Sequence, residues 1–554
     1  VGARLNMAYW LRGKAKTAPV RHDVWIGSVL GISNHLPAIL DVCAEYPCRS
    51  YQGAYRALPL LDMVTPSKND LVQTALILET LRQKHGKVLV CCALGYGRSA
   101  AVVLTWLLSL PCAWTLARLQ FTGKTLILRL LMLPFIMPTL VAGMGVLALF
   151  GEHGLLWRGW QDTPALLLYG NLFFNLPVAV RSAYQGFLTV PAHRMAAAQT
   201  LGVNAWRQFW HVELPVLRPW LASAGCLIFL YCFSGFGLAL LLGGRQYATI
   251  EVEIYQLIAY ELDMEHAAVL VWLVLAITAG AGILNAWFGR QTKAAEWRPV
   301  APKAPSSLHQ YALLALTAAL LLCCCALPLA AIAWQAVQAG SAWRILADSD
   351  TWTAVGNTLR FSGIALIGAA VLGILHAAAA RHSTLFRSIT FLPFMISPVC
   401  LTFGALLAYP QHAGSLHLLL ALYVLMAYPF VSKDVLSAWD ALPRHYAAAA
   451  RTNGANALQT AWHVLRPLLT PALRRGMTFA AATGIGEFAA TLFLSRPEWQ
   501  TLTTLIYEHL GKVGQANYHK AMVLTFVLMA LAGTVFLCLD QKSGRDGDGQ
   551  GNQG

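Results

Sequence analysis

Apolar segments of membrane-spanning length recur through most of the chain and constrain its fold more than any other feature. A helix needs roughly 20 apolar residues to cross about 30 Å of hydrocarbon. About 11 segments of this kind alternate with short polar connections, near residues 100–117, 126–150, 163–183, 219–243, 267–288, 309–337, 356–380, 387–409, 415–432, 475–495 and 520–538. The sequence therefore predicts a mainly α-helical bundle that passes repeatedly through a membrane.

The composition supports a membrane protein and argues against nucleic acid as a partner. Of the 554 residues, 57% are hydrophobic and 12% are charged, whereas about a quarter of the residues of a soluble domain are charged. The formal net charge is +15, but Lys and Arg lie in short connections rather than in one basic stripe. The 12 cysteines show no metal-ligand spacing, so we expect no metal and no other cofactor.

The charges of the connections predict which of them face the cytoplasm. Loops rich in Lys and Arg stay inside, which places the 118–129 loop and the linker 289–308 in the cytoplasm. The 245–266 loop carries five acidic residues against Arg245 and is expected outside. Alternation between these points leaves the 184–218 and 433–474 loops cytoplasmic.

These two cytoplasmic loops are copies of each other. The sequence PAHRMAAAQTLGVNAWRQFWHVELPVLRP begins at Pro191, and PRHYAAAARTNGANALQTAWHVLRPLLTP begins at Pro443. They align without gaps at an offset of 252, which pairs Gly202 with Gly454, Asn204 with Asn456, Trp210 with Trp462, His211 with His463, Pro215 with Pro467 and, in the preceding apolar segment, Pro177 with Pro429. Duplicated bundles of this kind are typical of pseudo-symmetric transporters, in which the substrate path runs between the repeats.

Each copy predicts a short helix, a glycine break, a second helix and a proline stop. Glycine permits the positive φ that a sharp turn between two helices requires. Such a loop forms a rigid elbow that protrudes from the bundle. It can dock into a groove on a cytoplasmic partner.

On these residues the loops resemble the coupling loop of bacterial ABC-importer permeases, whose pattern is E-A-A, three residues, G and then I-x-L-P. The resemblance covers about residues 100–540 and implies a separate ATP-binding subunit, expected to be a homodimer, and a periplasmic substrate-binding protein. The coupling residues that it implies are Ala196, Ala197, Ala198, Gly202 and Pro215 in the first loop and Ala448, Ala449, Ala450, Gly454 and Pro467 in the second.

The chain departs from that pattern at its first position. Ala196 and Ala448 stand where the pattern has glutamate, so any salt bridge from that glutamate to the ATPase is absent, although we expect docking to be retained. Within the family, GGRQYATIEVEIYQL from Gly243 and LPFIMPTLVAGMG from Leu133 are most similar to thiamine-transport permeases. Fused iron(III) permeases are the alternative.

One ionisable residue within a predicted span is a candidate for the substrate path. Polar groups inside a bilayer are costly and therefore often functional. Glu487, in TGIGEFAATLF, lies near the middle of its segment, where it could line the path or form a hydrogen bond between helices. An ion-coupled carrier would need several such carboxylates, and Glu487 is the only clear one, so we rank that function last.

Residues 1–105 differ from the rest and predict a small α/β fragment with a helical stretch from Asp70 to Lys84. The run VLVCCALGYGRSAAVV reads as a strand, a Gly-containing loop and a helix start, which together can hold a phosphate and stabilise a thiolate. These residues resemble the dual-specificity protein phosphatases. The resemblance implies Cys92 as nucleophile, Arg98 as phosphate clamp, Asp62 as general acid and Ser99 as the residue assisting thiolate release.

Two departures leave the activity of this fragment open. Cys91 stands where the phosphatases usually have His, and the chain enters permease-like sequence where their remaining helices belong. The fragment could therefore be a cradle that only binds anions, or the chain could be a membrane-anchored cysteine-dependent phosphatase. The permease region is not expected to be catalytic itself.

The predicted domains are a phosphatase-like fragment (1–105), a first permease half (106–288), a cytoplasmic linker (289–308), a second half (309–540) and a disordered polar tail (541–554). The second half has six predicted spans and the first has five, so the first half lacks its first helix where the fragment joins it. This clipped junction suggests the hypothesis that one reading frame joins parts of two proteins. The expected function is a multi-pass permease of the bacterial inner membrane, in contact with lipid and not with nucleic acid.

Overall fold

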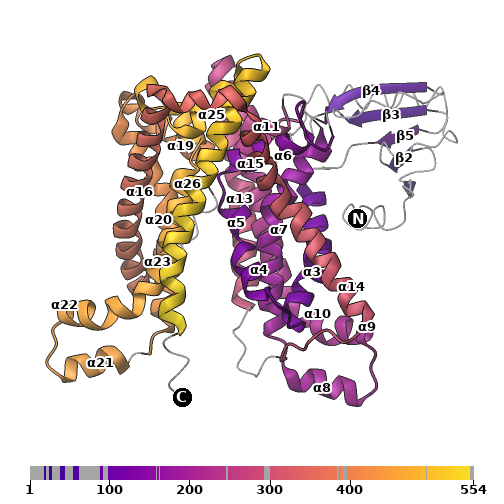
Figure 1. Cartoon of the computed structure of the whole chain (residues 1–554), viewed down its shortest axis with the longest axis vertical. Helices are drawn as coiled ribbons and strands as arrows, with labels where there is room; N and C mark the ends of the chain where they lie inside the picture. Colours follow the sequence, from indigo (N-terminus) through magenta and orange to yellow (C-terminus); the bar gives the residue numbers. More distant parts are fainter. Residues whose placement is uncertain are drawn as a thin grey trace. The chain divides into compact units, whose positions relative to one another are not determined.

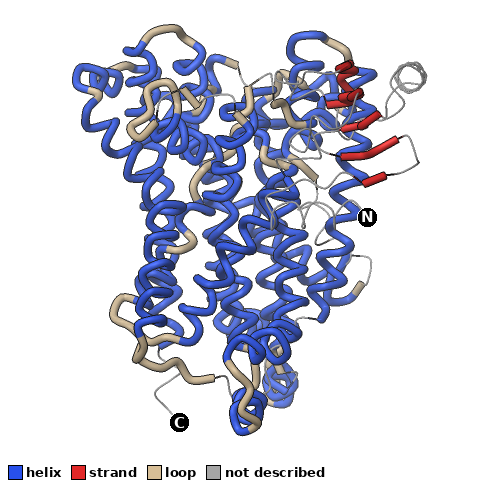
Figure 2. Tube along the Cα trace, turned by 90° about the vertical axis from the view of Figure 1, so that its right-hand side faces the viewer, coloured by secondary structure: helices blue, strands red, loops and turns tan. Residues whose placement is uncertain are grey.

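The computed structural model describes most of the chain as two compact units, residues 1–100 and 101–554. The described residues are 18–19, 24–27, 38–43, 54–60, 88–91 and 98–548, without 158, 161–162, 245–246, 292–299, 384–385, 388–389, 391–395, 444 and 495. The first unit contains a sheet. The second is a bundle of helices (Figures 1 and 2).

The first unit has a five-stranded sheet in the order β1-β2-β5-β3-β4. Its strands are β1 (Ala18–Pro19), β2 (Val24–Gly27), β3 (Ala38–Cys43), β4 (Ala54–Leu60) and β5 (Val88–Cys91). Only the β1–β2 pair is antiparallel, and β2, β5, β3 and β4 run parallel. A mostly parallel sheet agrees with the predicted α/β character, whereas the helix predicted from Asp70 to Lys84 lies outside the described residues.

The helices of the first permease half follow the predicted order of spans and loops. They are α3 (Arg98–Arg118), α4 (Lys124–Leu130), α5 (Leu133–Ile136), α6 (Thr139–Phe150), α7 (Pro164–Leu188), α8 (Ala192–Thr200), α9 (Ala205–Gln208), η2 (Phe209–Glu213), α10 (Leu214–Phe233), α11 (Phe236–Leu242), α12 (Ile250–Gln256), η3 (Leu257–Glu261) and α13 (Met264–Gln291).

The second half repeats this order from α20 onward. Its helices are α14 (Leu308–Leu321), η4 (Leu322–Ala326), α15 (Leu327–Gln338), η5 (Gly340–Ala347), α16 (Ser349–His382), α19 (Pro398–Ala408), η6 (Pro410–His412), α20 (Leu416–Ala441), α21 (His445–Thr452), α22 (Ala457–Thr460), η7 (Ala461–Leu465), α23 (Arg466–Ile485), α24 (Ala489–Leu494), η8 (Pro497–Trp499), α25 (Leu502–Gly511) and α26 (Gln515–Asp548). The starts of α7, α9, α10 and α12 map onto those of α20, α22, α23 and α25 at the offset of 252.

Six described helices are long and apolar enough to cross a membrane, and a seventh span is possible if α4–α5 and α6 count as one bent helix. These seven correspond to predicted spans. The other four predictions, 100–117, 163–183, 387–409 and 475–495, coincide with α3, α7, α19 and α23–α24, which do not meet the same criterion among the described residues. Helix α19 is apolar but has only 11 residues, too few to meet the length required. Helix α7 buries the polar side chains of Asn171 and Asn175 against protein rather than lipid, which lowers its hydropathy.

Several predicted spans are broken, and one of the breaks occurs at corresponding places in the two halves. The bend between α5 and α6 is 100° and lies at Met137 and Pro138. The α10–α11 break at Ser234 and Gly235 corresponds, at the offset of 252, to the α23–α24 break that begins at Gly486. Broken helices within the membrane region are tolerated where they are buried in protein or line a cavity.

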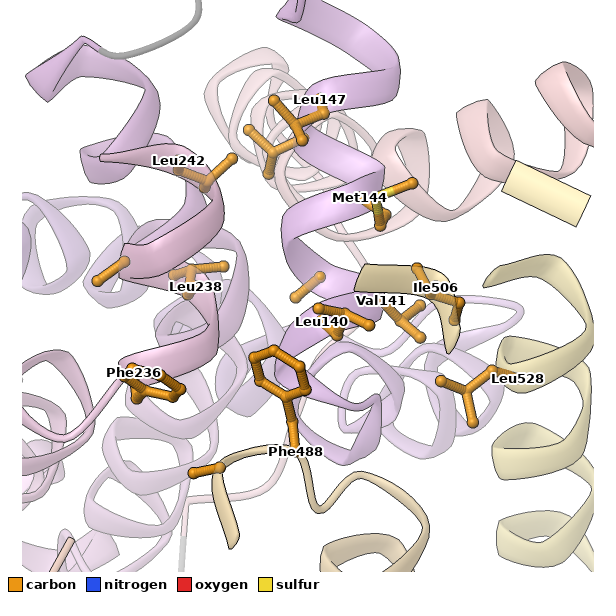
Figure 3. Packing of buried hydrophobic residues seen from close by; sticks show 14 of the residues in the cluster. Leu140, Val141, Met144, Leu147, Phe236, Leu238, Leu242, Phe488, Ile506 and Leu528 are labelled. Carbon is orange, nitrogen blue, oxygen red and sulfur yellow. The ribbon is translucent and has the colours of Figure 1, made fainter. Parts of the chain in front are cut away.

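The largest hydrophobic core joins the two halves. Its fully buried members include Leu140 and Met144 of α6, Leu242 of α11, Ile506 of α25 and Leu528 of α26. Figure 3 shows these side chains together with Phe236 and Phe488. Because residues from both repeats fill one core, the halves are held together at this level of the bundle.

The first helical segment of the second half packs against the first half. The Gln335 side chain on α15 donates hydrogen bonds to the backbone oxygens of Ala148 and His153, and it accepts one from the Tyr518 hydroxyl. The Tyr169 hydroxyl donates to the backbone oxygen of Cys323. Residues 308–338 therefore contact both halves.

The linker and the C-terminal segment complete the bundle. Lys303 exchanges backbone hydrogen bonds with Arg118 and Gln120, so two segments predicted on the same side of the membrane lie together. Helix α26 continues to Asp548, although a disordered tail was predicted from residue 541. Extending an existing helix costs little compared with starting one, which accounts for these additional helical residues.

Candidate functional site

The two repeated loops have the same backbone conformation. We call residues 191–218 elbow 1 and residues 443–474 elbow 2; both lie at one end of the bundle, which we call the elbow end (Figure 1). Gly202 has φ 68° and Gly454 has φ 80°, values that L side chains rarely adopt. No neighbouring atom lies within 4 Å of a Cβ built at either glycine, so the backbone conformation alone requires glycine there.

The hydrogen bonds around each glycine are also repeated. Val203 N–H donates to Ala198 O at 3.1 Å, and Ala455 N–H donates to Ala450 O at 3.1 Å, which closes the end of α8 and of α21 in the manner of a glycine C-cap. The next helices are capped by Asn204, which accepts from Arg207 N, and by Asn456, which accepts from Gln459 N. Each elbow is thus a rigid helix–turn–helix.

The predicted coupling residues lie on the surfaces of the elbows. Ala196, Ala197, Ala448 and Ala449 are exposed, whereas Ala198 is buried and Ala450 is half-buried. Exposed alanines leave a flat helix face that a partner can approach closely. The predicted proline stop is wrong: Pro215 lies inside a continuous helix from Ala205 to Phe233, directly after the π-helical turn η2, and Pro467 follows η7 in the same way.

A buried ion pair holds elbow 1 against the bundle. Arg118 at the end of α3 donates hydrogen bonds from Nε and Nη2 to Glu213 Oε1, at 3.1 and 2.7 Å. Their side chains are only 7% and 3% exposed, and the guanidinium lies 5.7 Å from the centre of the Phe187 ring. In elbow 2 the position of Glu213 is occupied by Leu465.

A cavity of about 260 Å³ lies between the two halves. Its walls include residues that correspond at the offset of 252, namely Phe174 and Met426, Leu230 and Ala482, Tyr231 and Thr483, and Ser234 and Gly486. The repeat axis therefore passes through the cavity. Most of its walls are apolar and five of its aromatic side chains are Phe135, Phe174, Tyr231, Phe430 and Phe479.

Four aromatic rings meet near this cavity in a pseudo-symmetric cluster. Phe236 and Phe488, which correspond at the offset of 252, stack with ring centres 5.9 Å apart. Phe236 contacts Tyr255 edge-on at 5.5 Å, and Phe488 contacts Tyr507 edge-on at 5.4 Å. Phe236 opens α11, Tyr255 lies on α12 and Tyr507 lies on α25. Helices α11 and α25 lie at the end of the bundle opposite the elbows (Figure 1). We call these rings the four-ring cluster.

Glu487 lines the cavity and also caps a helix. It is 6% exposed, and its Oε1 accepts a hydrogen bond from Ala490 N at 2.9 Å, which satisfies the N-terminus of α24. Its backbone oxygen accepts from the Thr503 hydroxyl. The sequence left open a substrate-path role and a hydrogen bond between helices; the structure places the residue on the cavity wall, with its carboxylate bonded to its own helix.

Sequence reasoning missed several residues of the cavity. Asn171 lines it, and the buried Asn175 donates to Asn171 O and to Cys232 Sγ. The four-ring cluster was also missed, although extending the repeat offset beyond the elbows would have paired Phe236 with Phe488 and Tyr255 with Tyr507. Asn171 of the cavity wall and Asn175 behind it have no such signal, because their burial depends on how α7 and α10 pack.

The phosphatase-like residues are described only in part. Cys92 and Asp62 lie outside the described residues. Arg98 and Ser99 open α3, and β5 ends at Cys91, whereas the predicted Gly-containing loop between them lies outside the described residues. Over the part of the chain that the structure describes, no group of three or more His, Cys, Asp or Glu residues is placed to hold a metal ion.

The match to a family model decides the class of the bundle. The model for the binding-protein-dependent transport system inner membrane component matches twice, at residues 109–294 and 369–541. The chain belongs to this family. The two matches coincide with the two structural repeats, so this inner membrane component is a fused, multi-pass membrane protein whose halves each carry one copy of the domain.

Relatives of this inner membrane component include thiamine transport system permease proteins named ThiP. The protein from Salmonella typhimurium is 27% identical over 468 residues, covering 78% of this chain and 85% of the relative. The Escherichia coli protein gives the same identity and coverage over 469 residues. A probable sulfate transport system permease protein from Marchantia polymorpha is 27% identical over 246 residues, covering 42% of this chain.

The family match begins at residue 109. It therefore lends no support to the resemblance of the N-terminal residues to dual-specificity phosphatases. Family membership rests on the bundle alone.

Proposed function

We propose that the chain is the permease of an ABC importer that moves thiamine inward across the membrane, driven by a separate ATP-hydrolysing subunit and supplied by a periplasmic binding protein. The observation that carries this proposal is the pair of elbows, which repeat the same φ values, caps and turns at one end of the bundle. A coupling role explains why the elbow is present once in each half. Both elbows then lie in the cytoplasm.

The cavity is chemically suited to thiamine. Thiamine joins a flat aminopyrimidine to a positively charged thiazolium ring, and aromatic walls bind flat rings and cations through stacking and cation–π attraction. The Glu487 carboxyl group on the same wall places a polar group among the aromatic rings. An iron(III) ion would instead require several oxygen ligands, which favours thiamine over the iron(III) alternative.

The four-ring cluster gives the proposed path a closed outer end. With the elbows in the cytoplasm, the cluster lies on the outer side of the cavity. Rings stacked across the repeat axis exclude water, and separation of the two halves would pull Phe236 away from Phe488. The structure therefore suits a state in which the cavity is sealed from the periplasmic side.

ATP-driven uptake in proteoliposomes tests the proposal. The full chain is co-expressed with candidate ATP-hydrolysing and binding-protein subunits, and uptake of labelled thiamine is measured with and without ATP. Gly202→Pro and Gly454→Pro should each abolish uptake, because proline cannot adopt positive φ. Gly340→Pro is the matched control, since Gly340 also has positive φ, 52°, but follows α15 outside both elbows.

The outcomes separate cargo from coupling. ATP-driven uptake that Gly340→Pro retains and both elbow variants lose supports the proposal. ATP hydrolysis stimulated by the inserted chain without thiamine uptake would reject thiamine as the cargo. Uptake that survives both elbow substitutions would reject coupling through the elbows.

A further inference from the structure

The polar side chains on the cavity wall differ between the two halves. Those of the second half are bonded to their own helices: the Thr483 hydroxyl donates to Phe479 O at 3.0 Å, and Glu487 caps α24 as described above. The first half contributes Thr139, Asn171, Tyr231 and Ser234. The hydrogen-bonding groups of the second half are therefore largely occupied within the protein.

Asn171 of α7 is the most deeply buried of the polar residues that the first half contributes. It is 5% exposed, whereas Thr139, Tyr231 and Ser234 are half-buried. Among the described residues its side-chain amide forms no hydrogen bond, although its backbone oxygen accepts one from Asn175 Nδ2. Burying an amide without a partner is unfavourable. A cargo in the cavity that pairs with the amide would offset this loss.

Aromatic rings lie beside Asn171 on the cavity wall. Phe174 follows it by three residues on the same face of α7, and the Phe174 ring packs against Phe135 and Tyr231 with ring centres 5.3 and 6.3 Å apart. All three rings line the cavity. A flat heteroaromatic ring can stack on such side chains while a neighbouring amide binds its edge, as occurs when proteins bind unstacked bases.

The amide has no counterpart in the second half. The residue that corresponds to Asn171 at the offset of 252 is Tyr423, whose hydroxyl is hydrogen-bonded to the Thr491 hydroxyl at 2.7 Å. Tyr423 is 2% exposed and does not reach the described cavity wall. An amide on one side of the repeat axis distinguishes the two halves for a cargo that lies between them.

The Asn171 amide is complementary to one edge of thiamine. An amide carries a donor and an acceptor side by side, and asparagine uses both to bind the ring nitrogen and the adjacent amino group of adenine. The aminopyrimidine of thiamine presents the same pair, an amino group next to a ring nitrogen. A buried hydrogen-bonding group also discriminates strongly, because a cargo that lacks the matching group leaves it unpaired.

From these observations we propose that Asn171 determines specificity for the aminopyrimidine ring, by binding its amino group and the adjacent ring nitrogen while Phe174 and Tyr231 pack on the ring. The inference rests on the proposed function and names the side chain that selects the cargo. It places the aminopyrimidine against α7. The positively charged ring then lies toward Phe430 and Phe479, the aromatic wall of the second half.

Binding of thiamine and of one analogue tests the role of Asn171. The analogue carries hydrogen in place of the amino group on the pyrimidine ring. Each compound is titrated into the full chain in nanodiscs and followed by ligand-observed NMR, which detects weak binding. The binding protein is left out because it has a selectivity of its own. The unchanged chain should bind thiamine about tenfold or more tightly than the analogue.

Replacement of the amide should remove this preference. Asn171→Leu should bind the two compounds equally, and it should bind the analogue as the unchanged chain does, which shows that the cavity is intact. Asn517→Leu makes the same replacement in the first turn of α26, where the Asn517 side chain donates to Val513 O, and should keep the preference. If Asn171→Leu binds neither compound, Asn171→Ala makes the comparison with a smaller side chain.

The outcomes separate the inference from the proposed function. Equal binding of the two compounds by the unchanged chain, or a preference that survives in the Asn171 variants, overturns the inference and leaves thiamine as the cargo. Loss of both compounds by Asn171→Ala as well would make the residue structural and overturn the inference too. ATP-driven uptake of thiamine without binding to the chain overturns the inference alone, whereas neither binding nor uptake rejects the proposed function with it.

Discussion

The two elbows share a backbone but differ in how they are anchored. In elbow 1 the turn η2 ends at Glu213, which is buried against Arg118 of α3. Elbow 2 has Leu465 at that position, and the ion pair between Arg387 and Asp440 at its root is 49% and 39% exposed. Exposed pairs contribute little to stability, whereas breaking a buried pair is costly. The repeat therefore preserved the shape of the elbow while the anchoring of the two copies diverged.

The largest expected effect tests this difference in anchoring directly. Glu213→Gln leaves the Arg118 charge buried without its partner, which should cost about 3–5 kcal/mol of unfolding free energy. Asp440→Asn, the control in the other half, should cost less than about 1 kcal/mol. Thermal unfolding in detergent and amide exchange over residues 205–218 measure both changes.

A double variant sharpens the same comparison. Replacing both Arg118 and Glu213 by Leu gives elbow 1 an apolar anchor like that of elbow 2 and should recover most of the lost stability, because no charge remains buried. If Glu213→Gln unfolds at the same temperature as the unchanged chain, the two elbows are not anchored differently.

The four-ring cluster predicts equal effects in the two halves. Phe236→Ala and Phe488→Ala each remove one ring of the same stacked pair, so both should open the seal and allow ATP-independent leakage of thiamine from proteoliposomes. Phe526→Ala removes a ring that packs on Trp343 elsewhere in the bundle and serves as the control for general destabilisation. Leakage from only one of the two variants would show that the rings do not act as a pair.

Substitution of the helix caps in the two elbows should lower stability by a smaller amount, and by different amounts in the two elbows. Asn456 forms a capping box in which its backbone N–H also donates a hydrogen bond to Gln459 Oε1, whereas Asn204 accepts one bond from Arg207 N. Substitution of either by Ala should cost about 1 kcal/mol, with the larger loss at Asn456. Amide exchange at residues 207 and 459 measures the difference, and a larger loss at Asn204 would contradict it.

The smallest predicted effect is the loss of the Asp263 helix cap at low pH. Hydrogen bonds from His266 hold the pKa of Asp263 below its ordinary value of 3.8, because its carboxylate caps the start of α13. The cap is therefore present above about pH 3.8 and is lost as pH falls through the lowered pKa. The protection factor of the His266 amide against exchange should fall with that titration, and this step should be missing in Asp263→Asn. Gln515, the counterpart at the start of α26, should show no such titration.

Much of the architecture could be predicted from local pattern. Apolar segments indicated the long helices, and the offset of 252 indicated the elbows with their glycine turns. A sharp turn between two short helices requires a residue with positive φ, and glycine is the residue that adopts it readily. This requirement is local and does not depend on distant contacts. The broken helices were predicted as continuous spans, because short interruptions at Pro138, Gly235 and Gly486 barely change the average hydropathy of a segment.

The sequence by itself determined that this chain is a duplicated helical membrane protein, because the length of the apolar segments and the spacing of the repeat can be measured along the sequence. Only the tertiary structure decided which side chains line the cavity, that Phe236 meets Phe488 across the repeat axis, and that Glu213 is withdrawn from the surface by Arg118. These contacts join residues far apart in the chain. Their geometry depends on how the helices pack, which no local pattern specifies.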